Sequence, residues 1–318
     1  MKINLVDHIE LVHGAAEVVA AENGFTFLRM SSPLTEFYSY SEAAEIRANC
    51  ASGVRICFRS NTPFVAMQLS YGRPARQIYA VDMVVDGVQR STFAPESVED
   101  GFAFDAELPA GGGEHTIELY LPHLCECTVL ELAIADGATL EPVKYQGGRI
   151  IFLGDSITQG MTSTSPLRSY SAMLSAGLKR DFHNICVGGA VMRQEVGRMA
   201  LDFSWNTAVV AFGVNDCSQK RPLEDFTADT RGLLEALTSR EGASIYMLTP
   251  IPWLSGPEGN NLEEYREIIR KVAADFDQVT VIEGTDLVPA ESEYLADGCH
   301  PNDTGMQVFA ENLLAKIR

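Results

Sequence analysis

Residues 149–160 read RIIFLGDSITQG, and this stretch decides how the rest of the chain can be interpreted. An apolar run ends in a Gly-Asp-Ser turn, which is typical of a buried strand that stops at a polar site. In open α/β sheets, ligands bind beyond the carboxyl ends of the strands. The stretch therefore places the hydroxyl of Ser156 where a nucleophile is useful. A serine in this position is also a good helix N-cap, so both interpretations stay open at this point.

Downstream of this strand, apolar runs alternate with helical patterns at the spacing of βαβ units. Strands are predicted at residues 150–153, 183–187, 208–212, 244–248 and 279–282. Helices are predicted at about residues 166–179, 223–237, 262–276 and 306–317. Continuous apolar runs are typical of parallel strands that helices cover on both faces. The pattern predicts a three-layer α/β/α domain with five parallel strands.

Upstream of residue 148 the pattern changes to short strands separated by turns. Strands are predicted at residues 25–29, 54–59, 63–69, 78–85, 102–106, 115–121 and 128–134. Asp86-Gly87 follows an apolar run and is a strong signal for a two-residue hairpin turn. We find no sustained helical period in this part. It predicts a β-sandwich or jelly-roll-like domain over residues 1–147, with the α/β domain over residues 148–318.

The charge of the chain limits its partners. The 318 residues include 24 basic and 43 acidic ones, which gives a net charge of −19. Such a surface repels nucleic acid and anionic membranes, so neither is expected as a partner. No run approaches the ~18 apolar residues of a membrane span, and the first residues lack the features of a signal peptide. We expect a cytoplasmic protein, and self-association stays open.

The seven cysteines are odd in number and scattered along the chain, which does not predict a disulfide framework. One short group, His123-x-Cys125-x-Cys127, contains residue types that bind metals. Its spacing differs from the Cys-x2-Cys pattern that is usual at zinc sites. The group is better interpreted as part of an ordinary strand, and no metal site is expected.

Polar residues stand at four strand or loop ends: Gly154-Asp155-Ser156, Gly188-Gly189, Gly213-Val214-Asn215-Asp216 and Asp297-Gly298-Cys299-His300-Pro301. A serine nucleophile needs a base within hydrogen-bond reach and a group that orients the base. Asp297 and His300 are three residues apart and can reach one another if their loop turns. A tetrahedral intermediate also needs donors for its negative oxygen, which Gly189 N–H and the Asn215 amide can supply.

These four blocks, in this order, resemble the SGNH (GDSL-type) hydrolase superfamily over about residues 148–318. The resemblance implies a flavodoxin-like fold without a metal or an organic cofactor. It implies that Ser156 is the nucleophile, that His300 is the general base and acid, and that Asp297 orients His300.

The same resemblance implies an oxyanion hole built from Ser156 N–H, Gly189 N–H and the Asn215 side chain. Two further residues are candidates for the substrate pocket. Trp253 lines either that pocket or the protein interior, and Asp155 either braces the turn before Ser156 or faces the pocket. The resemblance alone does not separate these alternatives.

A β-sandwich before such a domain resembles the carbohydrate esterases that remove acetyl groups from polysaccharides, and the likeness rests on architecture. We therefore expect a serine esterase that cleaves short acyl esters, acetyl above all, from a small molecule or an oligosaccharide. The same site would also suit an acyltransferase, a thioesterase or a lysophospholipase. An alternative outside enzymes is a carbohydrate-binding protein with an inert hydrolase domain.

Overall fold

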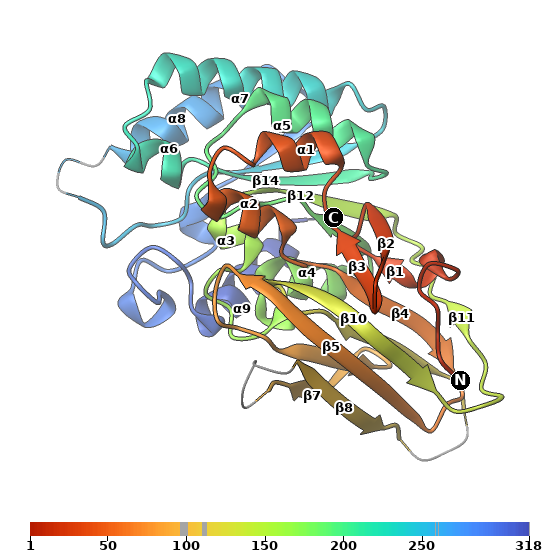
Figure 1. Cartoon of the computed structure of the whole chain (residues 1–318). Helices are drawn as coiled ribbons and strands as arrows, with labels where there is room; N and C mark the ends of the chain where they lie inside the picture. Colours follow the sequence, from red (N-terminus) through yellow and green to blue (C-terminus); the bar gives the residue numbers. More distant parts are fainter. Residues whose placement is uncertain (96–100, 110–112, 258, 260, 318) are drawn as a thin grey trace.

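The computed structural model describes residues 1–95, 101–109, 113–257, 259 and 261–317. Two antiparallel sheets come first in the chain, and a parallel sheet with helices on both faces follows (Figure 1). This arrangement confirms the predicted fold class. The predicted division at residue 147 stays a prediction, because N-terminal helices pack against the parallel sheet as described below.

Within the described residues, the parallel sheet has five strands in the order β13-β12-β14-β15-β16. Their bounds are β12 (Arg149–Gly154), β13 (Asp181–Asn184), β14 (Thr207–Ala211), β15 (Ser244–Leu248) and β16 (Val279–Ile282). In chain order this is 2-1-3-4-5, the flavodoxin-like order, which has its switch point between β12 and β14. Ligand sites in such sheets lie at the switch point. Ser156 lies there, just beyond the carboxyl end of β12.

The side chains of β12 alternate between the two faces of the sheet and pack into two different apolar cores. Ile151 and Leu153 belong to the core under one layer of helices, whereas Ile150 and Phe152 belong to the core under the other layer. The first layer contains α5 (Gln194–Met199), α6 (Val214–Ser218), α7 (Leu223–Thr238) and α8 (Leu262–Ala273). The second contains α3 (Ser156–Gln159), α4 (Tyr170–Leu178) and α9 (Asp303–Leu314). Short 3₁₀ turns are η1 (Ile9–Leu11), η2 (Pro166–Arg168), η3 (Ala200–Asp202), η4 (Gly284–Asp286) and η5 (Ser292–Tyr294).

The two antiparallel sheets enclose a separate apolar core. Among the described residues, one sheet has the order β1 (Val12–His13), β4 (Arg55–Ser60), β9 (His115–Tyr120), β6 (Val81–Val85), β7 (Val88–Phe93), and β11 (Glu141–Pro142) pairs with β4. The other has the order β2 (Glu17–Ala21), β3 (Gly24–Leu28), β10 (Cys125–Ile134), β5 (Phe64–Pro74), β8 (Phe102–Glu107). Asp86 and Gly87 join β6 to β7 with positive φ at both positions, as a two-residue hairpin turn of this type requires.

The N-terminal part has no sustained helical period in its sequence, but it does form two short helices. It contains α1 (Ser32–Phe37) and α2 (Glu42–Asn49), whose buried side chains belong to the same core as those of α5 and α7, and α1 lies beside α5 (Figure 1). Both helices are short, and the buried side chains of α2 are only Ala44 and Ala48, so no wide apolar stripe marks it. Such short helices form because tertiary packing stabilises them. One residue in the sequence indicated the start of α2. The hydroxyl of Ser41 accepts a hydrogen bond from Ala44 N–H and so caps the helix.

A buried arginine fastens α2 to the parallel sheet. The Arg29 side chain is 1% exposed and donates to the carbonyl oxygens of Arg47, Ala48 and Cys50 at the end of α2. It also donates to the carbonyl oxygens of Asn184, the last residue of β13, and of Cys186 just beyond it. A guanidinium has five N–H groups, and these five carbonyl oxygens can satisfy all of them. Burial lowers the pKa of Arg29 to about 10, so the group stays charged near neutral pH.

A second buried arginine joins β4 to β13. Arg55 Nη2 lies 2.6 Å from Asp181 Oδ1, and Arg149 Nε lies 2.7 Å from Asp181 Oδ2. The Arg55 guanidinium also stacks over the ring of Phe182, at 4.2 Å from its centroid. This ion pair therefore ties one antiparallel sheet to the edge of the parallel sheet.

We expect the Arg55→Met variant to lose about 3 kcal/mol of unfolding free energy, because the buried carboxylate of Asp181 loses the more deeply buried of its two arginine partners and keeps only Arg149. Arg59→Met is the matched control on the same strand. Arg59 pairs with Glu114 and Glu141 at the surface, and its side chain is 48% exposed. We expect it to lose less than about 1 kcal/mol. Urea unfolding at pH 7 measures the loss of unfolding free energy in both variants. Equal losses would contradict the stabilising role of the buried Arg55 ion pair.

Candidate active site

Ser156 is the first residue of α3, and one residue, Asp155, separates it from the end of β12. The interpretation of Ser156 as the helix N-cap is wrong, because Asp155 has that position and accepts a hydrogen bond from Ile157 N–H at 3.0 Å. Gly154 is required before it, since a Cβ there would lie 2.7 Å from the carbonyl oxygen of Ala211. The serine hydroxyl is therefore not used for capping and stands at the carboxyl edge of the sheet.

His300 and Asp297 complete a hydrogen-bonded chain with Ser156. The distance from Ser156 Oγ to His300 Nε2 is 2.8 Å, and the distance from His300 Nδ1 to Asp297 Oδ2 is also 2.8 Å. The other Asp297 oxygen accepts the backbone N–H groups of Cys299 and His300, at 3.0 and 2.8 Å. These bonds close the loop that the sequence suggested, and they fix the imidazole ring relative to the serine.

The Asp297 carboxyl is held in its charged form. Partial burial raises its pKa, but the hydrogen bonds from His300 and Cys299 outweigh burial and leave the pKa below its usual value. A charged Asp297 accepts the Nδ1 proton of His300, so Nε2 of the neutral ring is the nitrogen that can take a proton from Ser156. The arrangement can therefore perform general base chemistry on the serine hydroxyl.

Asn215, at the start of α6, follows β14, which is the neighbour of β12 in the sheet. Its Nδ2 donates to the carbonyl oxygen of Ala190 at 3.0 Å and to Asp155 Oδ2 at 3.3 Å. Both N–H groups of the amide thus have protein acceptors. The bond to Asp155 is the longer one, so this N–H is the one that an oxyanion can share.

Gly189 lies in the turn after β13. Its φ is +83°, and neither its N–H nor that of Ser156 donates to any acceptor within the described part of the chain. Both residues are half-buried. Two backbone N–H groups without protein acceptors, on residues that are only half-buried, are suited to bind an oxygen of a ligand.

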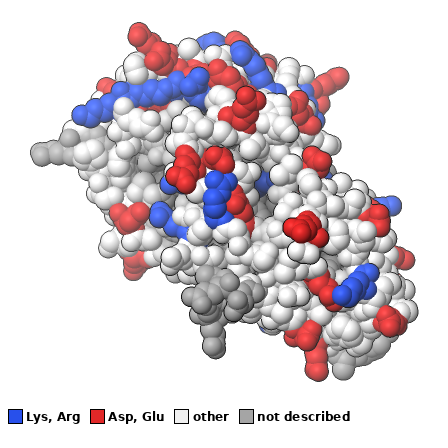
Figure 2. Space-filling view, in the orientation of Figure 1, with Lys and Arg blue, Asp and Glu red and all other residues white. Residues whose placement is uncertain are grey.

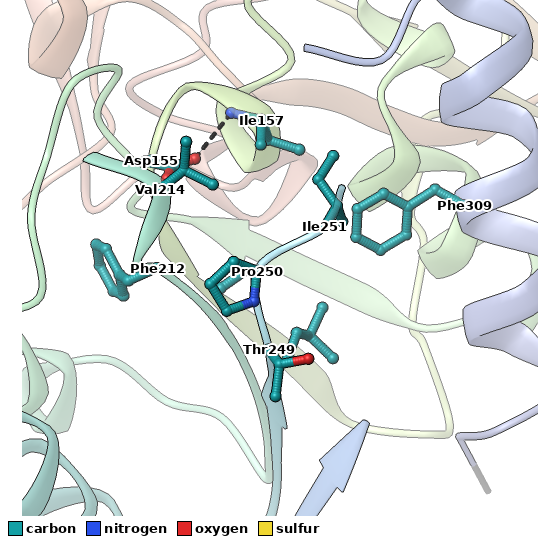
Figure 3. Close-up of a pocket in the computed structure, with 10 residues that line it drawn as sticks. Asp155, Ile157, Phe212, Val214, Thr249, Pro250, Ile251 and Phe309 are labelled. Carbon is teal, nitrogen blue, oxygen red and sulfur yellow. Dashed lines mark hydrogen bonds between the residues drawn. The ribbon is translucent and has the colours of Figure 1, made fainter. Parts of the chain in front are cut away.

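Asp155 is buried, with 2% exposure. Burial raises the pKa of its carboxyl to about 6, and the neighbouring charge of Asp216 adds to this, although the Ile157 N–H and His300 oppose it. Asp155 lines a cavity of about 20 Å³ together with Pro250, Ile251 and Phe309 (Figure 3). This volume suits about one water molecule, so the cavity is too small for a substrate. In this structure the Asp155 carboxyl accepts hydrogen bonds from Ile157 N–H and from the Asn215 side chain, and so holds both in place.

Trp253 follows β15 in a loop beside the histidine. Its ring packs partly buried against both cores of the α/β layers, and its Nε1–H donates to Ser255 Oγ at 3.1 Å. The next two backbone N–H groups, of Leu254 and Ser255, donate to the carbonyl oxygen of Gly298. The Trp253 loop therefore supports the Asp297–His300 loop, and the role of Trp253 in a pocket stays a prediction.

Sequence reasoning missed two residues near this site. Arg47, on α2, donates from Nη1 to the carbonyl oxygen of Gly188 at 2.8 Å. Gln159, on α3, accepts the Gly188 N–H at 2.7 Å and donates to the carbonyl oxygen of Arg47 at 2.8 Å. Gln159 stands in the stretch that opens the α/β part, but nothing in the sequence connects Arg47 to it.

The His123 group has no arrangement for a metal. His123 is buried and its Nε2 lies 3.1 Å from the carbonyl oxygen of Gly160, while Cys125 and Cys127 are buried in β10. Burial lowers the pKa of His123 to about 4. No group of three or more His, Cys, Asp or Glu side chains suited to a metal lies within the described residues.

Charge is spread over the surface in the view of Figure 2, with acidic side chains scattered across this face. Basic side chains gather toward the end that α7 and α8 form, and on α8 they pair with acidic neighbours, as Arg270 does with Glu263, Glu267 and Glu283. Within the described residues, no helix has both the length and the apolar character that a membrane span requires.

Residues 152–308 match the model of the GDSL-like Lipase/Acylhydrolase family. The matched segment contains Ser156, Gly189, Asn215, Asp297 and His300. Residues 152–308 therefore form a domain of the SGNH (GDSL-type) hydrolases, as the four sequence blocks predicted. No curated protein sequence matches the chain.

Solved structures extend the likeness to nearly the whole chain. The salicylyl-acyltransferase SsfX3 from a tetracycline biosynthetic pathway is 22% identical, with a TM-score of 0.81 over 95% of this chain and 92% of that one. A protein from Bacteroides ovatus described as a GDSL-like lipase is 19% identical, with a TM-score of 0.79 over 97% and 96%. A family two carbohydrate esterase from Clostridium thermocellum, in complex with cellohexaose, is 17% identical, with a TM-score of 0.69 over 96% and 98%. At these identities the likeness concerns the fold.

The raised pKa of Asp155 makes the stability of the folded protein depend on pH. Its folded pKa of about 6 lies above the ordinary value, so the folded protein binds a proton more tightly than the unfolded chain. Stability should therefore fall as pH rises from about 4 to about 6, by about 2–3 kcal/mol from this group. Asp155→Asn keeps a capping side chain but cannot titrate, so relative to wild type it should gain stability over this range.

Urea unfolding at pH 4, 5, 6 and 7 measures this difference. Asp277→Asn, at an exposed position, is the control and should follow the wild-type profile within about 0.5 kcal/mol. Parallel profiles of wild type and Asp155→Asn would contradict the raised pKa of Asp155.

Proposed function

We infer that the protein is a serine esterase that forms an acyl-enzyme on Ser156. The observation that carries this is the chain of two 2.8 Å contacts, from Asp297 through His300 to Ser156 Oγ. The match of residues 152–308 to the GDSL-like lipase/acylhydrolase family model supports it. An inert hydrolase domain in a carbohydrate-binding protein is a poorer explanation, because its serine and histidine would not need to stay in hydrogen-bond contact.

The reaction follows from the roles of these atoms. Ser156 Oγ attacks the ester carbonyl carbon while its proton moves to His300 Nε2. The tetrahedral intermediate collapses, the C–O bond to the alcohol breaks, and His300 returns the proton to the leaving oxygen. Water then gives a proton to His300 and attacks the acyl-serine. The acid leaves as the proton returns to Ser156 Oγ.

The negative oxygen of each intermediate needs donors. We assign the backbone N–H groups of Ser156 and Gly189 to this role, because neither has an acceptor within the described residues. The Asn215 amide is the third donor, through the N–H that is 3.3 Å from Asp155 Oδ2. Donors that are fixed before the reaction lower the barrier without reorganisation.

The substrate class that we propose is a short acyl ester, acetyl above all, on a carbohydrate. The support is architectural: the likeness to the carbohydrate esterase in complex with cellohexaose covers 96% of this chain, and so includes the antiparallel sheets. We place Trp253 at the edge of the substrate pocket, because its loop contacts the histidine loop at Gly298.

Acyl transfer to an acceptor other than water is the second candidate. A specific observation favours it: SsfX3, a salicylyl-acyltransferase, has a TM-score of 0.81 to this chain over 95% of its length. The acyl-enzyme is common to both reactions, and only the acceptor differs. The choice therefore depends on whether water or an alcohol reaches the acyl-serine first.

Ser156→Ala should reduce the hydrolysis of p-nitrophenyl acetate to the background rate, a loss of about 10⁴-fold or more, because the nucleophile is removed. Absorbance of released p-nitrophenolate measures the rate. Ser239→Ala, at an exposed serine that ends α7, is the control and should keep wild-type activity. Full activity of Ser156→Ala would contradict the assigned nucleophile.

Substrate preference can be measured on p-nitrophenyl esters of increasing acyl length and on acetylated saccharides. We expect kcat/KM to fall by about tenfold or more from acetyl to octanoyl, a difference of about 1.4 kcal/mol or more. Acetate release from acetylated saccharides should exceed that from acetyl-CoA. Product analysis with added alcohol acceptors separates hydrolysis from transfer. Transfer product in excess of free acetate would favour the acyltransferase.

A further inference from the structure

We propose that Arg47 is a positioning residue that fixes the peptide between Gly188 and Gly189, so that the Gly189 N–H faces the oxyanion. It acts from α2, which precedes the α/β part of the chain. This proposal rests on the proposed function, because the oxyanion hole has meaning only if Ser156 is a nucleophile. It gives the N-terminal part of the chain a role in the chemistry.

The turn that carries Gly189 can adopt two forms. Ala190 N–H donates to the carbonyl oxygen of Val187 at 3.0 Å, so residues 187–190 form a β-turn with Gly188 and Gly189 at its centre. The φ of +83° at Gly189 identifies the type II form. In a type I turn the central peptide is turned over, which reverses its carbonyl and N–H. Two glycines permit either form without steric cost, so other contacts must select one.

Side chains hold Gly188 at both of its backbone polar groups. Arg47 Nη1 donates to its carbonyl oxygen at 2.8 Å, and Gln159 Oε1 accepts its N–H at 2.7 Å. The peptide unit is planar and trans, so its C=O and N–H point in opposite directions. The bond from Arg47 to Gly188 O therefore directs the Gly189 N–H away from the guanidinium. A charged donor on the carbonyl also polarises the peptide and strengthens that N–H as a donor.

Arg47 is itself held in place from several sides. Its carbonyl oxygen accepts Arg29 Nη2 at 2.9 Å and Gln159 Nε2 at 2.8 Å. Its guanidinium pairs with no carboxylate within the described part of the chain. A Cβ on Gly189 would come within 3.2 Å of Arg47 Nη1, which places the guanidinium against this turn. The charge of Arg47 is therefore directed to the turn and not neutralised elsewhere.

The turn also connects the donors of the oxyanion hole. The carbonyl oxygen of Ala190, its last residue, accepts the Asn215 amide at 3.0 Å. Turning over the 188–189 peptide would remove the Gly189 N–H from the hole, while the Ser156–His300 contact would stay. The expected defect is thus in the stabilisation of the intermediate, and not in substrate binding or in the nucleophile.

Arg47→Met keeps much of the stem but removes the donor. We expect its kcat on p-nitrophenyl acetate to fall about 10–100-fold, which is somewhat less than the loss of a whole oxyanion donor, with KM within about threefold. The second-order rate of Ser156 labelling by a fluorophosphonate probe should fall in parallel, because that reaction also places a negative oxygen in the hole. Arg47→Lys retains one cationic donor and should recover part of both rates.

Arg73→Met is the matched control, because Arg73 pairs with Glu45 on the same helix without touching the turn. It should keep kcat and labelling within about twofold. Wild-type kcat and labelling in Arg47→Met would overturn the proposal, and so would a rise in KM at constant kcat, which would make Arg47 a substrate-binding residue.

The two proposals fail in different ways. Ester hydrolysis that survives in Ser156→Ala overturns the esterase mechanism. Labelling of Ser156 without any acetyl ester hydrolysis overturns the substrate class, and the labelling rates still decide the role of Arg47. No labelling of the wild type overturns both proposals. If Arg47→Met does not fold, the comparison of Arg47→Lys with wild type decides, since equal labelling rates would contradict the role of Arg47.

Discussion

The burial of one positive charge is the constraint on which much of this structure depends. The Arg29 guanidinium is buried and pairs with no carboxylate among the described residues, and such a charge is tolerable only if its N–H groups all find acceptors. Its acceptors are carbonyl oxygens at the end of α2, at the end of β13 and just beyond β13. These two segments are far apart in the sequence, so this arginine holds the N-terminal part of the chain at the same edge of the sheet as Ser156.

The parallel sheet supplies the other half of the arrangement. Because the order is 2-1-3-4-5, the strands before Ser156 and Asn215 are neighbours, and the polar residues after them meet at the switch point. Ser156 and His300 are 144 residues apart but lie within hydrogen-bond distance. The antiparallel sheets do not supply these residues, yet α2 beside them contacts the turn that carries Gly189.

Most of the strands and the serine–histidine–aspartate set could be predicted from the sequence, because apolar runs and short local motifs determine them. The second strand of the parallel sheet is less regular than predicted. β13 ends at Asn184, although Ile185 and Val187 still donate to the carbonyl oxygens of Phe152 and Gly154. Beyond the strand, the Asn184 side chain accepts the Cys186 N–H, a local bond that an apolar pattern does not indicate.

The sequence by itself determined the class of fold, the strand ends and the residues that belong to the hydrolase motifs, because these depend on local periodicity and spacing. Only the tertiary structure decided that Asp155 caps α3 while Ser156 stays available, and that α2 lies against the turn after β13. The physical reason is that Arg29 and Arg47 act through backbone carbonyl groups, which every residue has. No residue type marks such acceptors in a sequence, so folding alone reveals which carbonyl groups these arginines reach.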